Sequence, residues 1–176
     1  MRPVRRVAEL GSFGSKHMIR IRTPTEADSP ALLELVRQFP SPTPSSAAEL
    51  AAIFVRKLND STAYIFVAED EVGLVGYVSG CRHTAFYAGG DTAWVDEILV
   101  SPSHRDRDIG SLLMEAFEQR AAAECCKLVS LATAGAGPFY SKRGYETKAG
   151  YYKKYLGRAE QTIAADRREN AAPAER

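Results

Sequence analysis

The chain has 176 residues, 23 basic and 22 acidic side chains, a formal net charge of +1 and 45% hydrophobic residues. This length fits one globular domain with a sizeable core and leaves little room for a second. No apolar run reaches the roughly 18 residues needed to cross a bilayer, and the N-terminal segment lacks the apolar core of a signal peptide. The near balance of charges argues against a protein that mainly holds nucleic acid phosphates. We therefore expect neither a membrane nor a nucleic-acid partner.

The cysteines and histidines are too scattered to predict a disulfide framework or a metal site. Cys125 and Cys126 are adjacent and Cys81 stands alone, so no even-numbered set or paired ligand spacing can be drawn. No two of the three histidines have a zinc-ligand spacing of four residues. We expect no metal, and a reducing, cytoplasmic setting.

Three segments of different character follow one another along the chain. Residues 1–17 carry four Lys or Arg side chains against one Glu and show no sustained hydrophobic period, which predicts a disordered leader. An alternating run from Met18 predicts the first strand of a folded domain that spans residues 18–156. Residues 157–176 have balanced charges and little apolar content, which predicts a polar tail.

Within the domain, strands and helices alternate. The first helix begins at the capping-box spacing of Thr25 and Asp28 and stops near Pro40, where a proline-rich loop begins. The remaining predicted elements are, in order, a helix over 48–58, strands over 64–68, 73–79 and 92–100, a helix over 109–124, a strand over 128–132, a short helix over 137–143, and one or two strands within 145–156. This order indicates the α/β (α+β) class.

Chemistry concentrates where the strand ending at Val100 gives way to the helix beginning at Ile109. A short basic loop lies there, at a helix N-terminus whose backbone N–H groups and dipole bind phosphate. Gly110 would let the chain approach a ligand closely. Charged residues before a helix also occur as a plain solvated cap, and that interpretation stays open.

The order of strand, Arg105, Gly110 and amphipathic helix resembles the pyrophosphate loop of the GNAT superfamily of acyl-CoA N-acyltransferases. That loop reads Arg or Gln, two residues, Gly, one residue, then Gly or Ala. Arg105 and Gly110 match its ends, and Asp108 stands in the place of the first glycine. This replacement of glycine by Asp108 puts a carboxylate where the pyrophosphate would approach.

A second segment, one helix and one strand further on, resembles a later GNAT signature. Thr133 stands in place of the family's Asn, and the matching positions are Ala136, Phe139, Tyr140, Gly144 and Tyr145. The two motifs lie in the order that the family requires, and together the resemblance covers residues 18–156.

The resemblance implies a GNAT fold with a mixed, mostly antiparallel central sheet of six to seven strands and about four flanking helices. It also implies acetyl-CoA as cosubstrate, with its pantetheine arm between two splayed strands, along Ile98 and Val100, and an oxyanion-stabilising amide at Leu99. The implied cofactor contacts are completed by Arg105, Asp106, Arg107, Asp108, Ile109, Gly110, Ser111, Thr133 and Phe139.

Amine acetylation needs a base, because a free alkyl ammonium has a pKa near 10.4 and only the neutral amine attacks. Asp96 and Glu97 are the adjacent candidates. Strict alternation sends them to opposite faces, with Asp96 on the side of Ile98, although a bulge could redirect either one. Either carboxylate could instead be a strand-edge charge or pair with the substrate ammonium. Tyr140 corresponds to the family's usual proton donor for the departing thiolate.

These expectations amount to an N-acetyltransferase that moves an acetyl group from acetyl-CoA to a primary amine by direct attack. The acceptor class stays open between a small molecule and a peptide or protein amine, and a homodimer is compatible with the sequence. The alternative is a non-catalytic acyl-CoA-binding sensor or interaction module, which the departures at Asp108 and Thr133 favour.

Overall fold

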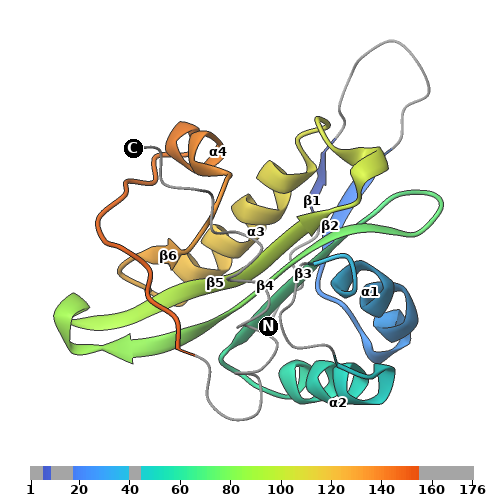
Figure 1. Ribbon diagram of the computed structural model, residues 1–176, viewed down its shortest axis with the longest axis horizontal. Helices are drawn as coiled ribbons and strands as arrows, with labels where there is room; N and C mark the ends of the chain where they lie inside the picture. The colour runs from blue at the N-terminus through green and yellow to red at the C-terminus, as the bar shows by residue number, and fades with distance from the viewer. Residues whose placement is uncertain (1–5, 9–17, 40–44, 155–176) are drawn as a thin grey trace, which may run out of the picture. The chain divides into compact units, whose positions relative to one another are not determined.

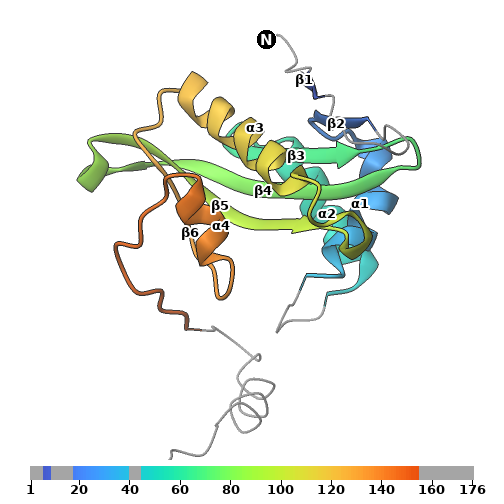
Figure 2. The same ribbon diagram turned by 90° about the horizontal axis from the view of Figure 1, so that it is seen from above.

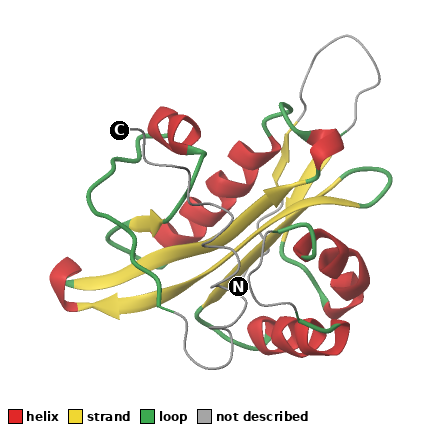
Figure 3. Ribbon diagram, in the orientation of Figure 1, coloured by secondary structure: helices red, strands yellow, loops and turns green. Residues whose placement is uncertain are grey.

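The computed structural model describes residues 6–8, 18–39 and 45–154 (Figures 1 and 3). These residues fall into two compact units, one formed by 1–39 with 46–132 and the other by 40–45 with 133–176. The first unit contains the sheet and the helices that cover it. The proline-rich loop over 40–44 and the expected tail lie outside the described residues.

The sheet has its six described strands in chain order, so each strand pairs with its neighbours in sequence. The pairings from β1 to β5 are antiparallel, and β6 adds to β5 in parallel. The mixed, mostly antiparallel sheet is therefore confirmed. The strands are β1 (Arg6–Ala8), β2 (Ile19–Arg22), β3 (Ala63–Glu69), β4 (Leu74–Ala85), β5 (Gly90–Val100) and β6 (Val129–Leu131).

Four α-helices and three single 3-10 turns complete the described elements, close to the predicted positions. The turns are η1 (Glu26–Asp28), η2 (Phe86–Ala88) and η3 (Pro102–His104). The helices are α1 (Ser29–Val36), α2 (Ala47–Leu58), α3 (Ile109–Ala123) and α4 (Gly137–Lys142). In the described part of the chain, no helix is long and apolar enough to span a membrane.

Helix α2 begins where the sequence provides a complete capping box. The Ser46 hydroxyl accepts a hydrogen bond from the backbone N–H of Glu49 at 3.2 Å, and the Glu49 carboxylate accepts from the N–H of Ser46 at 2.7 Å. Two backbone donors that the helix leaves unpaired are thereby satisfied. This cap fixes the start of the helix that carries Lys57 to the sheet.

Helices cover both faces of the sheet (Figures 1 and 2). On one face, α1 and α2 bury a cluster formed by Leu32, Leu35, Phe54, Ile65, Val67 and Tyr77. On the other face α3 packs closely, because a Cβ at Gly80 would lie 2.8 Å from the Phe117 ring of α3. Successive residues of β4 therefore alternate between the α2 face and the α3 face.

Two expectations need correction. Of the leader that was expected to be disordered, residues 1–5 and 9–17 lie outside the described residues, but Arg6–Ala8 forms β1, which pairs with the open edge of β2. Strands were expected within 145–156, but residues 145–154 form none. Their tyrosines favour strands, yet a strand also needs a hydrogen-bonding neighbour, and Tyr151 and Tyr152 are instead exposed.

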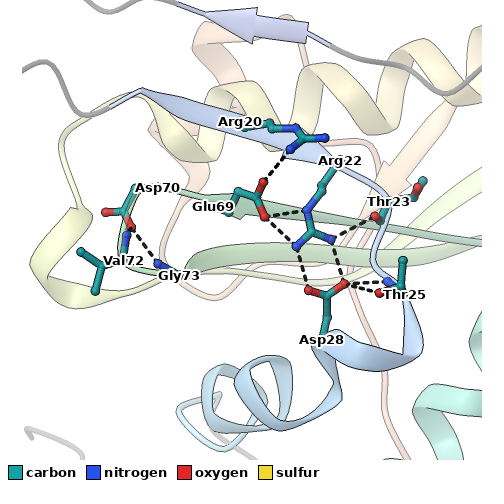
Figure 4. Close-up of polar contacts among 9 residues, drawn as sticks. All are labelled: Arg20, Arg22, Thr23, Thr25, Asp28, Glu69, Asp70, Val72 and Gly73. Carbon is teal, nitrogen blue, oxygen red and sulfur yellow. Dashed lines mark hydrogen bonds and ion pairs between the residues drawn. The ribbon is translucent and has the colours of Figure 1, made fainter.

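A network of charges joins β2, β3 and η1 (Figure 4). The Arg22 guanidinium binds the Asp28 carboxylate at 2.7 Å and the Glu69 carboxylate at 2.6 Å. The hydrogen bond from Arg22 lowers the pKa of Asp28 to about 2, against the opposing effect of burial. Asp28 also accepts from the backbone N–H of Thr25 at 2.7 Å. The network fixes the path from the first domain strand into α1.

Candidate active site

The two sides of β5 are paired to different lengths. On one side β4 accompanies β5 from Gly90 to Val100, whereas on the other side β6 pairs only with Ala93, Trp94 and Val95. Ile98 and Leu99 therefore lie beyond the last parallel pair. Among the described strands nothing pairs with this side of the end of β5, as the expected separation of the two strands requires. An extended ligand could add to such an edge.

A β-bulge interrupts β5 at Asp96. Ser79 pairs with Glu97 and Gly80 pairs with Val95, so Asp96 is the extra residue. The Asp96 carboxylate contacts Lys57 of α2 and therefore lies on the α2 face. Strict alternation would have placed Asp96 and Glu97 on opposite faces. The other alternative, that a bulge redirects one of them, is the one found, because the extra residue brings both carboxylates to the side of Lys57.

Lys57 links the Asp96 carboxylate to β4 by hydrogen bonds. Its Nζ donates to Asp96 Oδ2 at 3.0 Å and to the buried Ser79 hydroxyl at 3.0 Å. The Asp96 side chain is 40% exposed, so this ion pair borders solvent. Lys57 lies 39 residues from Asp96 in sequence, and no local motif could have pointed to it. The Lys57 contact is the part of the site that the sequence analysis missed, whereas the bulge is one of the two alternatives that it left open.

Glu97 is the less exposed of the two acids. Burial raises its pKa above the usual range and the charge of Asp96 raises it further, while Lys57 and Tyr77 oppose these effects. Tyr77 is 1% exposed, and its hydroxyl lies close enough to Glu97 for the carboxylate to affect its pKa. Burial first, and then the negative charge of Glu97, raise the pKa of Tyr77. A carboxylate with a raised pKa beside a buried phenol is an arrangement suited to proton transfer.

The loop before α3 has the backbone conformation that glycine favours. Asp106 and Asp108 have positive φ angles of 60° and 54°, a region in which aspartate is more tolerated than most residues. The Asp108 side chain makes no capping hydrogen bond to α3. The departure from the family glycine therefore keeps the turn and adds an exposed carboxylate.

The first turn of α3 presents backbone donors rather than side chains. The Ile109 side chain is 1% exposed and belongs to the core, so only its backbone N–H is available to a ligand. The first helical bond runs from Leu112 N–H to the Asp108 carbonyl oxygen at 3.0 Å. The N–H groups of Ile109, Gly110 and Ser111 therefore have no partner within the helix. With the exposed Arg105 before them, these groups fit a pyrophosphate.

The second unit contains Tyr140 in α4. The Tyr140 side chain is 8% exposed and makes edge contacts with the rings of Phe139 and Tyr145, at centroid distances of 5.0 and 5.7 Å. Burial raises the pKa of Tyr140, which keeps its hydroxyl protonated as a donor must be. Gly144, with φ of 85°, ends the helix in the left-handed conformation that glycine provides.

Thr133 has a local role in the same unit. Its hydroxyl oxygen accepts a hydrogen bond from the backbone N–H of Ala136 at 3.1 Å, and Ala136 is the N-cap of α4. The residue that replaces the family Asn thus supports the start of the short helix. Its expected contact with a cofactor, like that of Phe139, remains a prediction.

In the described ranges, no three His, Cys, Asp or Glu side chains gather in a way that could hold a metal ion. The three cysteines are free thiols. For Cys81, burial and then the charge of Asp96 raise the pKa, which is the opposite of what an activated thiolate requires.

An open strand edge and a helix N-terminus with unpaired backbone N–H groups together suit an extended ligand that carries a phosphate group. The family model described as an acetyltransferase (GNAT) domain matches residues 61–147, which include β3 to β6, α3 and α4. The chain belongs to the GNAT acetyltransferase family. No curated protein matches the chain closely enough to be counted as a relative.

Solved structures share this fold over most of the chain. An acetyltransferase from Trypanosoma brucei has 25% identity and a TM-score of 0.69, and covers 78% of this chain and 99% of its own. A glucosamine-6-phosphate N-acetyltransferase from Arabidopsis thaliana has 20% identity and a TM-score of 0.71, with coverage of 78% and 98%. A protein from Clostridium acetobutylicum that is described as a predicted acetyltransferase, solved with acetyl-CoA, has 17% identity and a TM-score of 0.66, with coverage of 79% and 97%.

Proposed function

We propose that this protein is an acetyl-CoA-dependent N-acetyltransferase that acts on a primary amine. The observation that carries the proposal is the bulge in β5, which gathers two carboxylates next to the unpaired edge of the same strand. A base for the amine and a binding edge for an extended donor thus adjoin in one element. The similar Arabidopsis enzyme, named for an amino sugar phosphate, and the Clostridium structure with acetyl-CoA support this chemistry.

The donor would be held mainly by backbone groups. Ile98 and Val100 offer the edge of β5 to the pantetheine arm, and the first N–H groups of α3 receive the pyrophosphate. Arg105 adds a positive charge at the start of this loop. When bound, acetyl-CoA supplies a thioester carbonyl for attack, and the backbone N–H of Leu99 is our candidate to stabilise its oxygen.

Glu97 is our candidate for the general base. Asp96 is engaged by Lys57 at 3.0 Å, whereas the pKa of Glu97 is raised chiefly by burial. A carboxylate with a raised pKa accepts a proton from an amine more readily than an ordinary one. Asp96 with Lys57 then serves to fix the bulge and to keep the negative charge of the site balanced.

Tyr140 is our candidate for the general acid. As the C–N bond forms and the C–S bond breaks, the thiolate of CoA takes the proton of the Tyr140 hydroxyl. Glu97 then releases the proton that it took from the amine to solvent, and Tyr140 takes up a proton from solvent. The products are the acetylated amine and free CoA thiol, so atoms and charges balance.

For the acceptor, we propose a small molecule with a primary amine. Two carboxylates on one face favour a cationic group close to them. The amine of a peptide is the other class, which a panel of acceptors would separate.

The test is an acceptor screen that measures thiol release from acetyl-CoA, together with the mass of the product and the affinity for CoA. The proposal expects CoA binding and amine-dependent thiol release, with a mass increase of one acetyl group on the acceptor. Tight CoA binding with no release over a broad panel of small amines and peptides would favour a sensor or interaction module. A folded protein that binds no CoA would contradict both the enzyme and the sensor hypothesis.

A further inference from the structure

Asp70 is a buried carboxylate in the turn between β3 and β4. Its Oδ1 accepts hydrogen bonds from the backbone N–H groups of Val72 at 2.8 Å and Gly73 at 3.1 Å (Figure 4). The side chain is only 2% exposed. A carboxylate buried to this extent needs partners for both oxygens, and the turn supplies partners for one.

The second oxygen of Asp70 binds a residue of a different segment. His104 Nε2 lies 3.1 Å from Asp70 Oδ2, and His104 Nδ1 lies 2.9 Å from the Ser103 hydroxyl. The backbone N–H of His104 donates to the Ser101 carbonyl oxygen at 2.8 Å, and that of Ser101 donates to the Val75 carbonyl oxygen at 2.8 Å. Turn η3 is therefore attached to the β3–β4 hairpin through both side chain and backbone.

This attachment lies directly before the loop that carries Arg105. The side chains of residues 105–108 are exposed, and within the described part of the chain none of them makes an ion pair. The loop is therefore anchored at its ends. The buried Ile109 side chain anchors the helix side, and His104 anchors the strand side.

We propose that Asp70 and His104 form a clamp that positions the loop 105–111 for the pyrophosphate of CoA. The two are positioning residues, since they act through the loop and not on the reacting atoms. The inference rests on the proposed function, because it assigns a role within that cofactor site. Neither residue belongs to the GNAT motifs matched in the sequence.

The charges in the clamp are suited to a lasting contact. Burial alone would raise the pKa of Asp70, but the two turn amides and His104 outweigh it and lower the pKa. Asp70 is therefore ionised at neutral pH. The imidazole can remain in place in either protonation state, because the Ser103 hydroxyl can donate to Nδ1 or accept from it.

Removing the clamp should weaken cofactor binding more than chemistry. A loop that is held before the ligand arrives loses less conformational freedom on binding than a loop that the ligand must order. A hydrogen bond to a charged group is strong enough to affect affinity about tenfold or more. The expected result is a higher KM for acetyl-CoA with a nearly unchanged kcat.

The test measures CoA affinity by calorimetry for four variants of the full chain. His104→Ala and Asp70→Asn should raise the Kd for CoA about tenfold. His104→Gln keeps an N–H that can reach Asp70 and should restore the Kd to within about threefold. Asp60→Asn is the matched control, because Asp60 also caps a turn, through Thr62 at 2.8 Å, but has no contact with η3. It should bind CoA like the parent.

Each outcome decides a different claim. If the parent binds CoA and His104→Ala binds equally well, the clamp is wrong and the proposed function stands. If Asp60→Asn weakens binding as much as Asp70→Asn, turn capping in general is responsible and the clamp is again wrong. If the parent itself binds no CoA, the proposed function fails and the clamp fails with it. Should His104→Ala unfold, Asp70→Asn at the melting temperature of the parent decides, because unchanged CoA affinity in that variant would overturn the clamp.

Discussion

The end of β5 and the loop before α3 bring their functional groups together in different ways. The loop consists of consecutive residues, so Arg105, Asp108 and Gly110 can be read from one stretch of sequence. The group at the end of β5 is assembled from Lys57 of α2, Ser79 of β4 and Asp96 of β5, and a bulge determines its geometry. The contiguous loop motif thus indicates where the acetyl donor would bind. The acceptor side of the site depends instead on contacts between residues that lie far apart in sequence.

The largest effect should come from substituting the two carboxylates one at a time and comparing the loss of activity. We expect Glu97→Gln to lower single-turnover acetylation by about 10³-fold, because it removes the base. Asp96→Asn should cost less than about tenfold, since Asp96 is the partner of Lys57. The check is rapid-quench kinetics with an active amine and with CoA affinity measured on the same samples. Equal losses for both variants would mean that the carboxylates act as one unit.

The role of Tyr140, which lies in the second unit, can be tested in the same way. Tyr140→Phe keeps the aromatic contacts to Phe139 and Tyr145 and removes only the hydroxyl. We expect turnover to fall about 100-fold and the Kd for acetyl-CoA to change by no more than a few-fold. Single-turnover rates and a binding isotherm provide the measurement. A loss of binding that parallels the loss of rate would make Tyr140 a wall of the cofactor pocket.

The contiguous loop can be tested by restoring its family residue. Asp108→Gly removes a carboxylate from a left-handed position and places there the residue that this conformation favours. We expect CoA to bind about three- to tenfold more tightly, because one negative charge no longer opposes the pyrophosphate. Calorimetry at two salt concentrations checks this, since the gain should shrink at high salt. Weaker binding would assign Asp108 a favourable contact with the donor.

A smaller effect is expected in the charge network at the start of α1. The pKa of Asp28, about 2, is lowered chiefly by Arg22, so its contribution to stability is full above pH 4. That contribution is lost as the pH falls from about 4 towards 2. Asp28→Asn should cost about 1 to 2 kcal/mol at pH 7 and less near pH 2. Urea unfolding at both pH values measures it, and an equal cost at both would contradict the role of charge.

The sequence predicts the fold well because its signals are local. The backbone N–H of Thr25 donates to the Asp28 carboxylate, as their capping-box spacing predicts, and the apolar period from Ile109 corresponds to α3. The bulge at Asp96 has no such signal, because one extra residue in a strand leaves a plausible alternating pattern. The ion pair between Lys57 and Asp96 spans 39 residues, and the Asp70–His104 pair spans 34. Such contacts follow from tertiary structure, which a sequence motif does not encode.

The pH dependence of kcat/KM for Lys57→Met tests most directly whether the bulge assembles a working carboxylate site. The positive charge of Lys57 lowers the pKa of Glu97 against the effect of burial, and Glu97 must be deprotonated to act as base. Without Lys57, the acidic limb of the profile should therefore move to higher pH, by about half to one unit. Arg56→Met, which removes an exposed charge from the same helix, is the control and should leave the limb in place. An acidic limb that is identical in the parent and in Lys57→Met, with the same acceptor, would contradict the account.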